Sequence, residues 1–440
     1  MERAGKACYG IRIFDKALEY FVQLNDIDDS ARVKAEVARC QKRILEQSGV
    51  YDMNVIHYSP FENRLDIADY WNPCIEIAQI EGKGRGIVAK NDIQPGTLVM
   101  VSKAFQKSFH IDVKDMMLFE LSFKTKRANR GTQMDCFAKV MGNVQKNKSQ
   151  LQKIYSLYSG PFSEDRKPQR LFADVDEQEM IVDAQVIHHI LSFNSFGSGV
   201  EKHDKEGDST GIWIEPSFFN HSCFKNTTNT FFGDAMFLYT DRVILAGEEL
   251  TISYLSPTDD YEKRQETVQK SYNFSCKCTL CTLDEKMSDK AVAKLKMLKE
   301  KYSDLKLEEK LKNGDLDRVI SQVVPIVNSI RSVYDESGRT KFRMQLYGPL
   351  LMLASLYLRF EHSYAKSIKL FDELLADVFG FDVESFLGDK QDSNCFILES
   401  SLSPAIKMMS ENYLLLGDKK KASIYGRALT KLHSNMGKKA

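Results

Sequence analysis

Four cysteines carry the clearest chemistry in this chain of 440 residues. Cys276, Cys278 and Cys281 form a C-x-C-x-x-C motif, and Cys223 lies far upstream in the string Asn-His-Ser-Cys at 220–223. A zinc ion takes about four thiolate or imidazole ligands in a tetrahedron. The motif leaves one position open, and Cys223 can fill it. The spacing predicts a structural zinc site that ties a downstream segment to the residues around His221, in preference to four unrelated cysteines.

The other five cysteines stand alone in the sequence. They are Cys8, Cys40, Cys74, Cys136 and Cys395. We interpret them as small buried apolar residues in a chain from a reducing compartment, because nine cysteines over this length are not a dense disulfide pattern. Residues 1–4 lack the apolar core of a signal peptide, and the longest apolar run, 350–358, is too short to span a bilayer. We therefore expect a soluble protein of the cytoplasm, the nucleus or both.

The composition limits the partners that we expect. Hydrophobic residues make up 43% and charged residues 28% of the chain, which is typical of a globular protein with two or three domains. Lys plus Arg and Asp plus Glu each number 61, so the chain lacks the net positive charge of a nucleic-acid-binding protein. We interpret the basic run 124–127 as a solvated face. We expect a monomer that binds neither nucleic acid nor membrane directly.

Three strings allow a functional and a structural interpretation. Residues 82–86, Gly-Lys-Gly-Arg-Gly, lie between two predicted strands, where they form either a plain hairpin turn or a backbone that a ligand can approach closely. Asn220 and His221 follow two phenylalanines, so their polar groups are expected to be buried and to need partners. The edge of a bound adenine would supply such partners. Tyr254 ends the predicted strand 247–254, where a tyrosine is more often a core residue than a catalytic one.

The order of these four motifs resembles the SET-domain protein lysine methyltransferases. The chain is most similar to the SET-and-MYND branch and to relatives that combine SET with TPR-like helices. The resemblance covers residues 75–105 and 181–283, and more loosely 284–440. It implies an enzyme that transfers a methyl group from S-adenosylmethionine to a lysine side chain in a protein substrate, histone or non-histone. The alternative is a catalytically inert SET/TPR scaffold that binds partner proteins; it is disfavoured because the motif residues are all present.

The resemblance also implies a role for each motif residue. Tyr254 and Tyr272 are the expected catalytic residues, and Tyr272 also helps to form the lysine channel. The residues expected to bind the cofactor are Lys83, Gly84, Arg85, Asn220, His221, Tyr254 and Phe274, the last by packing on the adenine. The substrate pocket is expected to include Asn194, Ser195, Phe196 and Tyr272. The structural Zn²⁺ would be held by Cys223, Cys276, Cys278 and Cys281.

The chain departs from the family pattern in two places that bear on function. Lys225 replaces the usual proline before Asn226, a change expected to loosen that turn. The zinc module called MYND is missing, because Cys136 is the one cysteine between Met100 and Cys223. A helical insert is expected in its place.

The predicted fold class is α+β, with a β-rich SET fold, a helical insert, a zinc-binding post-SET segment and a C-terminal TPR-like α-helical domain. Short strands are expected at 212–214, 231–232, 236–239, 243–245 and 250–254. We expect the charged residues 284–312 to form the first helix of the C-terminal region, with a solvated face. The predicted boundaries are an N-terminal TPR-like helical segment at 1–50, a linker at 51–74, the SET domain at 75–258 with its helical insert at about 110–180, the post-SET zinc segment at 259–283, and the C-terminal helical domain at 284–440.

Overall fold

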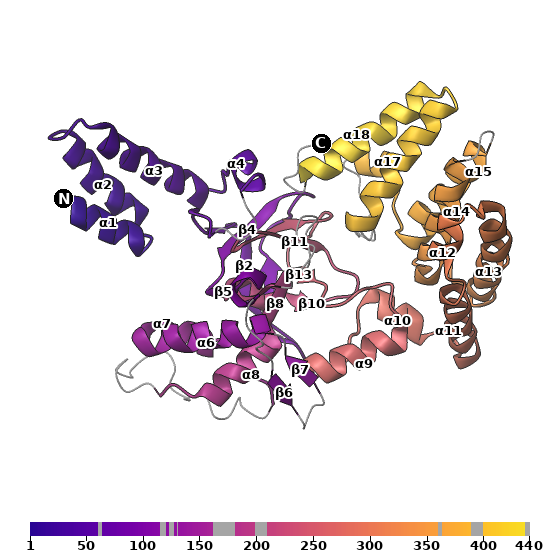
Figure 1. Cartoon of the computed structure of the whole chain (residues 1–440), viewed down its shortest axis with the longest axis horizontal. Helices are drawn as coiled ribbons and strands as arrows, with labels where there is room; N and C mark the ends of the chain where they lie inside the picture. Colours follow the sequence, from indigo (N-terminus) through magenta and orange to yellow (C-terminus); the bar gives the residue numbers. More distant parts are fainter. Residues whose placement is uncertain are drawn as a thin grey trace. The chain divides into compact units, whose positions relative to one another are not determined.

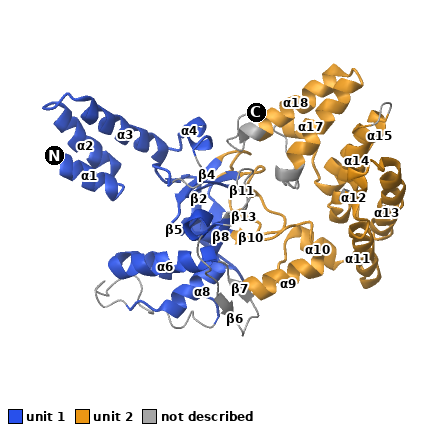
Figure 2. Ribbon diagram, in the orientation of Figure 1, with its two compact units in different colours: residues 1–90, 98–219, 229–239 blue, residues 91–97, 220–228, 240–440 orange. Residues whose placement is uncertain are grey.

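The computed structural model describes residues 1–59, 64–114, 120–122, 127–129, 131–161, 181–198, 209–359, 363–388 and 399–435. The chain divides into two compact units (Figure 2). Unit 1 comprises 1–90, 98–219 and 229–239, and unit 2 comprises 91–97, 220–228 and 240–440. Unit 1 combines helices with antiparallel sheets, whereas unit 2 is mainly helical (Figure 1). The predicted α+β class is confirmed.

Three helices open unit 1, as predicted. They are α1 (Glu2–Gly10), α2 (Phe14–Asn25) and α3 (Ala31–Gln47). The buried residues of α2, Phe14, Ala17 and Phe21, recur every three or four positions, which places them on one face. The hydroxyl of Ser30 caps α3 by accepting a hydrogen bond from the Val33 N–H. The fully buried thiol of Cys40 joins this small core, in agreement with its interpretation as an apolar residue.

The segment predicted as a linker packs into unit 1. It contains α4 (Met53–His57) and β1 (Tyr70–Trp71). Ile56, Leu65 and Ile67 are buried there, against strands of the same unit. The Glu46 carboxylate accepts a hydrogen bond of 2.7 Å from the Ala68 N–H, which fixes the backbone of the segment. The structure thus corrects the linker prediction, which rested on mixed polar sequence without a regular hydrophobic period.

Two sheets and a hairpin form the β-rich part of unit 1. The strands are β2 (Ile75–Ile80), β3 (Gly84–Ala89), β4 (Leu98–Lys103), β5 (Gln106–Ser108), β8 (Ser195–Ser198), β9 (Ser209–Ile212), β11 (Thr227–Phe232) and β12 (Ala235–Thr240), with the ends of the last two in unit 2. Strands β2 and β3 pair in an antiparallel hairpin that brings Ile80 opposite Gly84. The sheets have the orders β1-β4-β12-β11 and β5-β9-β8. The predicted strand at 212–214 ends at Ile212, and the short 3₁₀ turn η3 (Glu215–Phe218) begins soon afterwards.

The predicted helical insert contains helices and one small β-hairpin. The elements are α5 (His110–Val113), β6 (Glu120–Ser122), β7 (Arg127–Asn129), α6 (Gly131–Lys146) and α7 (Ser149–Tyr155). Helix α8 (Ala184–Asn194) follows the predicted insert. Strands β6 and β7 pair antiparallel, which the prediction of a purely helical insert missed. Residues 124–126 of the basic run lie outside the described residues.

Unit 2 begins with a short parallel pair of strands that supports the motif residues. Strand β10 (Asn220–His221) pairs with β13 (Glu249–Ile252) and places His221 opposite Ile252. The strand predicted at 243–245 is not formed, because Ile244 makes an isolated bridge with Ile93 and nothing longer. The ion pair of Arg242 with Glu248 folds this segment into the turn that precedes β13.

Helices form the rest of unit 2, as predicted for the C-terminal region. They are α9 (Tyr261–Tyr272), α10 (Thr279–Glu285), α11 (Asp289–Ser303), α12 (Leu307–Lys312), α13 (Leu316–Glu336), the 3₁₀ turn η4 (Met344–Leu346), α14 (Tyr347–Leu358), α15 (Tyr364–Glu373), the π-helical turn η5 (Leu374–Val378), α16 (Val383–Leu387), α17 (Glu399–Leu415) and α18 (Lys419–Asn435). The single charged helix expected at 284–312 is instead divided among α10, α11 and α12. Their resemblance to TPR repeats stays a prediction.

One continuous core joins the metal motif to these helices. Cys223, Cys276 and Cys281 belong to the same buried cluster as the apolar faces of α13, α14 and α17. Helix α13 contributes the most regular face, because Val319, Val323 and Ile326 are all buried at helical spacing. Among the described helices, no segment is both long enough and apolar enough to cross a membrane.

Candidate metal centre and active site

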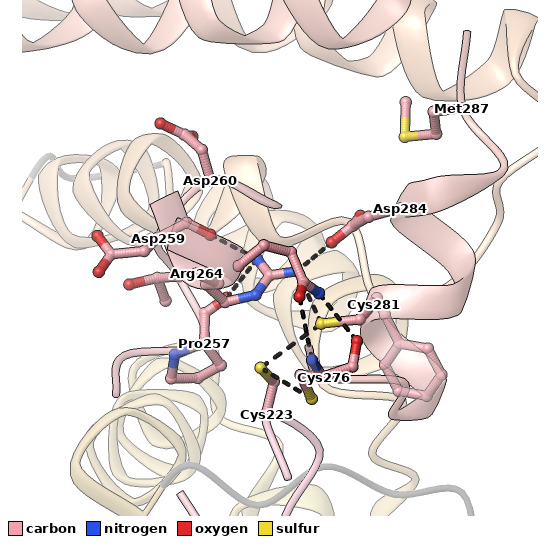
Figure 3. A network of polar contacts seen from close by, with 12 residues as sticks. Cys223, Pro257, Asp259, Asp260, Arg264, Cys276, Cys281, Asp284 and Met287 are labelled. Carbon is pink, nitrogen blue, oxygen red and sulfur yellow. Dashed lines mark hydrogen bonds and ion pairs between the residues drawn. The ribbon is translucent and has the colours of Figure 1, made fainter. Parts of the chain in front are cut away.

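The four cysteines of the predicted zinc site come together in unit 2. Their Sγ atoms all lie within 4.8 Å of one another. The Cys223 Sγ is 3.9 Å from that of Cys276 and 3.6 Å from that of Cys281 (Figure 3). Zinc–sulfur bonds of about 2.3 Å in a tetrahedron separate the sulfurs by about 3.8 Å. The described thiols therefore fit a zinc ion with four protein ligands, which has a structural role because no position is left for a substrate.

Local structure brings the downstream cysteines into place. Asn273 ends α9 in the left-handed conformation (φ 61°), which turns the chain sharply toward the motif. The Gln265 side chain then fixes the backbone of Cys276 from both sides: its amide donates to the Cys276 carbonyl at 2.9 Å, and its oxygen accepts from the Cys276 N–H at 3.0 Å. The C-x-C-x-x-C segment is held by α9 as well as by its own thiols.

Hydrogen bonds among the four thiols shift their pKa values in opposite directions. Cys223 and Cys281 are almost completely buried, and Cys278 is half-buried. Hydrogen bonds from the other thiols, that of Cys223 first, lower the pKa of Cys276 below its ordinary value, and the hydrogen bond from Cys223 lowers the pKa of Cys278 to about 6. Hydrogen bonds with the other thiols, that of Cys276 first, raise the pKa of Cys223. The hydrogen bond with Cys223 lowers the pKa of Cys281, but those with Cys276 and Cys278 raise it further, so this pKa also lies above its ordinary value. Thiolates are the form that binds zinc. In the ranges that the structure describes, no second group of three or more His, Cys, Asp or Glu side chains lies close enough to share an ion.

His221 links the metal motif to the predicted catalytic tyrosine. Its Nδ1 accepts a hydrogen bond of 3.0 Å from the backbone N–H of Tyr254. A neutral ring with an accepting Nδ1 carries its hydrogen on Nε2. The Nε2 atom is 3.3 Å from the Cys223 Sγ, so the same imidazole can donate to the thiolate. The backbone of Tyr254 is thereby tied to the cysteine cluster through one side chain.

Three aromatic side chains gather beside this histidine. The ring centroids of Tyr254 and Tyr272 are 4.8 Å apart, and that of Phe274 lies 5.9 Å from His221 and 6.4 Å from Tyr272. Tyr254, Tyr272 and Phe274 are half-buried, so each keeps part of its ring accessible. Burial raises the pKa of Tyr254 above its ordinary value, which keeps its hydroxyl protonated at neutral pH.

The Asn-His pair finds its polar partners inside the protein. Asn220 donates a hydrogen bond of 2.8 Å from its side-chain amide to the Glu249 carboxylate, and His221 is satisfied as described. The argument that these groups need an adenine edge as their partner is therefore wrong, because strand β13 supplies one. Their predicted contacts with the cofactor do not depend on that argument and stay a prediction.

The remaining predicted cofactor residues lie at the tip of the β2–β3 hairpin in unit 1. The Lys83 N–H closes the turn on the Ile80 carbonyl at 3.1 Å, which confirms the hairpin-turn interpretation. Gly84 has a φ of 77°, a conformation that favours glycine. The Arg85 guanidinium stacks 4.8 Å over the Phe218 ring and donates to the Ser156 carbonyl. All three residues are exposed, and their role in binding a cofactor stays a prediction.

The predicted pocket residues Asn194, Ser195 and Phe196 lie where α8 passes into β8, also in unit 1. The Asn194 amide donates to the carbonyls of Ile190 and Tyr158, each at 2.7 Å. Ser195 pairs with Ile212 of β9. The Phe196 ring packs 5.9 Å from Trp213. These contacts fix the side chains of Asn194 and Phe196 and the backbone of Ser195.

Comparison with known protein families identifies the domain that contains these residues. Residues 84–255 match the family model for the SET domain. The chain carries a SET domain. This assignment confirms the resemblance indicated by the order of the motifs. The matched residues contain most of the predicted site, from the hairpin at Gly84 to Tyr254, and end before the three downstream cysteines.

Curated proteins with related sequences carry the same domain or a methyltransferase name. A protein of Gibberella zeae called methyltransferase is 26% identical over 316 residues, covering 66% of this chain and 42% of that protein. Mouse histone-lysine N-methyltransferase SMYD3 is 34% identical over 120 residues, covering 27% of this chain and 28% of that protein. The putative SET domain-containing protein L678 of Acanthamoeba polyphaga mimivirus is 25% identical over 244 residues, covering 51% of this chain and 84% of that protein. The chain thus spans less than half the length of the first two relatives.

The departure at Lys225 does not loosen the SET motif as expected. The Asn226 side chain holds the turn, because its oxygen accepts from the Thr251 N–H at 2.7 Å and its amide donates to the Glu249 carbonyl at 2.8 Å. Lys225 replaces the rigidity of proline with an ion pair of 2.9 Å to Asp241, and both side chains are largely buried. The turn after Cys223 is therefore fixed by side-chain contacts.

Sequence reasoning missed the residues that surround the cysteines of the post-SET zinc segment. Gln265 and Arg264 of α9 contact Cys276 and Cys281, and Asp284 pairs with Arg264. Helical spacing predicts an amphipathic helix here but not which polar residue is buried. The sequence pattern places Asp284 on a solvated face, whereas in the structure its carboxylate is largely buried against two arginines.

Proposed function

We propose that this protein transfers a methyl group from S-adenosylmethionine to the side-chain amine of lysine in a protein substrate, histone or non-histone. The observation that carries the proposal is the aromatic group of Tyr254, Tyr272 and Phe274, tied through His221 to the cysteine cluster. Tyr254, His221 and Cys223 lie within the residues that match the SET domain. The names of the methyltransferase relatives support the same reaction. We further propose that the protein acts as a monomer in the cytoplasm, the nucleus or both.

The residues of the site fit a cofactor that contains an adenine. Phe274 keeps part of its ring accessible beside His221 and offers a face on which a base can stack. We assign the binding of S-adenosylmethionine to Lys83, Gly84, Arg85, Asn220, His221, Tyr254 and Phe274. When bound, the cofactor would supply an electrophilic methyl group on a sulfonium.

The aromatic side chains can prepare the substrate amine. A free lysine has a pKa of about 10.4, so most of it is an unreactive ammonium at neutral pH. The packed rings of Tyr254 and Tyr272 offer an apolar surface that disfavours the charged form by desolvation, which lowers the pKa of a lysine lying against them. A narrow channel also aligns the nitrogen for displacement, and most of the rate should come from this alignment. Asn194, Ser195 and Phe196 are proposed to line the substrate pocket.

Tyr254 acts in this proposal as a neutral hydroxyl. Because burial raises its pKa, it keeps its hydrogen and does not serve as the base. Its oxygen can instead face the partial positive charge that develops on the transferred carbon. The hydrogen bond to His221 holds the backbone of Tyr254, and its ring packs against Tyr272, so this stabilisation needs little rearrangement.

Calorimetric titration with S-adenosylmethionine tests the proposal against the scaffold alternative. We expect binding heat and a rise in melting temperature, followed by incorporation of tritiated methyl groups into lysine when a protein extract is added. A scaffold would give no heat and no thermal shift. That result, obtained with a folded and zinc-loaded chain, would exclude the enzyme.

A further inference from the structure

A buried arginine contacts the cysteine cluster from the side of α9. The Arg264 side chain is 1% exposed, and its Nη2 lies 3.8 Å from the Cys281 Sγ (Figure 3). The same guanidinium pairs with the Asp284 carboxylate. Its Nη1 donates to the carbonyls of Asp259 at 2.5 Å and Pro257 at 3.4 Å, in the loop that follows Tyr254. One side chain thus joins the thiols, this loop and an acidic residue.

The contacts continue from Asp284 into the helices of the C-terminal region. Its second carboxylate oxygen pairs with Arg339, whose side chain is 5% exposed. Arg339 also donates to the Phe342 carbonyl, in the turn between α13 and η4. The Phe342 ring packs edge-on against Phe224, with centroids 4.8 Å apart, and Phe224 follows the ligand Cys223 directly. The turn after α13 therefore contacts the metal segment both through ion pairs and through aromatic packing.

The charge of the site explains why a guanidinium belongs there. Four thiolates around one Zn²⁺ leave a net negative charge of about two in a buried place. A buried charge needs compensating donors, and arginine stays protonated in proteins. Donation from Arg264 to Cys281 would therefore favour the metal-bound thiolates. The negative charge of Asp284 disfavours the thiolates, but its hydrogen bond to Arg264 orients the guanidinium.

We propose that Arg264, oriented by Asp284, is a positioning residue that couples metal retention at the cysteine cluster to the packing of the turn after α13. Coupling of this kind is reciprocal, so zinc should stabilise that turn and a well-packed turn should raise the affinity for zinc. The inference rests on metal binding by the four cysteines and not on methyl transfer. A catalytically inert chain could therefore still confirm it.

Asp284→Asn separates this proposal from a simple effect of charge. If charge alone mattered, removing the carboxylate would leave more positive charge beside the thiolates and would raise the zinc affinity. If Asp284 orients Arg264, the same substitution lowers the zinc affinity because the guanidinium loses its alignment. The sign of the change decides between the two.

The experiment measures zinc affinity of the full chain by competition with the chromogenic chelator 4-(2-pyridylazo)resorcinol. We expect Arg264→Gln to weaken binding by about 10- to 100-fold, the range found when partners of metal ligands are removed. Asp284→Asn should weaken it by a smaller factor. Arg264→Lys keeps the positive charge and should fold. Because one ammonium group cannot contact all the partners of the guanidinium, we expect a zinc affinity between those of the wild-type chain and Arg264→Gln. Arg331→Gln is the matched control, because Arg331 pairs with Glu373 at 2.7 Å in the same unit.

The rate of backbone hydrogen exchange gives a second readout. An effect confined to the thiols would leave this rate unchanged in the turn after α13. Adding zinc to the wild-type chain should slow exchange in residues 339–343, and this response should shrink in Arg264→Gln and Asp284→Asn but not in Arg331→Gln. A wild-type chain that binds no zinc would overturn the inference. So would an unchanged or higher zinc affinity in Asp284→Asn, or a zinc response at 339–343 that survives in both variants.

Discussion

The two groups of residues assigned to the cofactor are built differently. In unit 2, His221 is fixed between the Tyr254 N–H and the Cys223 thiol, within a core that also contains the C-terminal helices. In unit 1, Lys83 and Arg85 lie at the exposed tip of a hairpin. Buried contacts hold the first group rigidly, whereas the second group is exposed. Substitutions in unit 2 should therefore affect stability or chemistry, and those at the hairpin should affect affinity alone.

The largest effect on methyl transfer is expected at Tyr254, the member of the rigid group that is assigned a catalytic role. Tyr254→Phe keeps the ring and its packing on Tyr272 but removes the hydroxyl. We expect methyl transfer, measured with tritiated S-adenosylmethionine, to fall by about 10²- to 10³-fold, in line with loss of one preorganised polar group. Affinity for the cofactor should stay within a few-fold by calorimetry. Wild-type activity in this variant would contradict the assigned role.

Loss of one metal ligand should show how far the rigidity depends on zinc. Cys278→Ser removes a thiolate, and we expect the free energy of unfolding to fall by several kcal/mol, on the order of 3–5, because structural zinc binding is coupled to folding. Denaturant unfolding and zinc content by mass spectrometry measure this. Cys74→Ser, at a half-buried cysteine outside the cluster, is the control. Unchanged stability together with unchanged zinc content would show that Cys278 is no ligand.

The hairpin provides the opposite test. Arg85→Ala removes the stack on Phe218 and a hydrogen bond at the surface, so we expect little change in melting temperature. If Arg85 binds the cofactor, affinity for S-adenosylmethionine should fall by about 10-fold, the value of one charged contact. Lys90→Ala, at the exposed end of the same hairpin, should leave that affinity unchanged. If the melting temperature of Arg85→Ala fell as far as that of Cys278→Ser, the proposed difference between the cofactor residues of unit 1 and those of unit 2 would be wrong.

The smallest effect expected concerns pH. Because the pKa of Tyr254 is raised, the protonated hydroxyl persists above its ordinary titration range, which centres at about 10. The rate of methyl transfer should therefore rise with pH as the substrate amine loses its proton, without a decline from ionisation of Tyr254 below about pH 10. A pH–rate profile of a chain that stays folded measures this. An activity that instead falls between neutral pH and about pH 9 would show that Tyr254 ionises early.

The sequence indicated ligands and motif order better than it indicated packing. Thiols at C-x-C-x-x-C spacing are typical of metal sites. All four metal ligands could therefore be predicted, although 53 positions separate Cys223 from Cys276. Burial of polar residues leaves no such pattern. Arg264 and Asp284 look like ordinary surface charges on helices, and Asn220 has a partner in Glu249 that depends on the pairing of β10 with β13. The packing of the segment before Trp71 could not be predicted either, because its buried apolar residues follow no regular helical or strand period.

Mass spectrometry of a protein extract incubated with the purified chain and isotopically labelled S-adenosylmethionine tests the central claim most directly. We predict labelled methyl groups on lysine side chains of one or more proteins, and about 10²- to 10³-fold less label when Tyr254→Phe replaces the wild-type chain. A folded, zinc-loaded chain that binds the cofactor but leaves every lysine unlabelled would contradict the proposed methyl transfer.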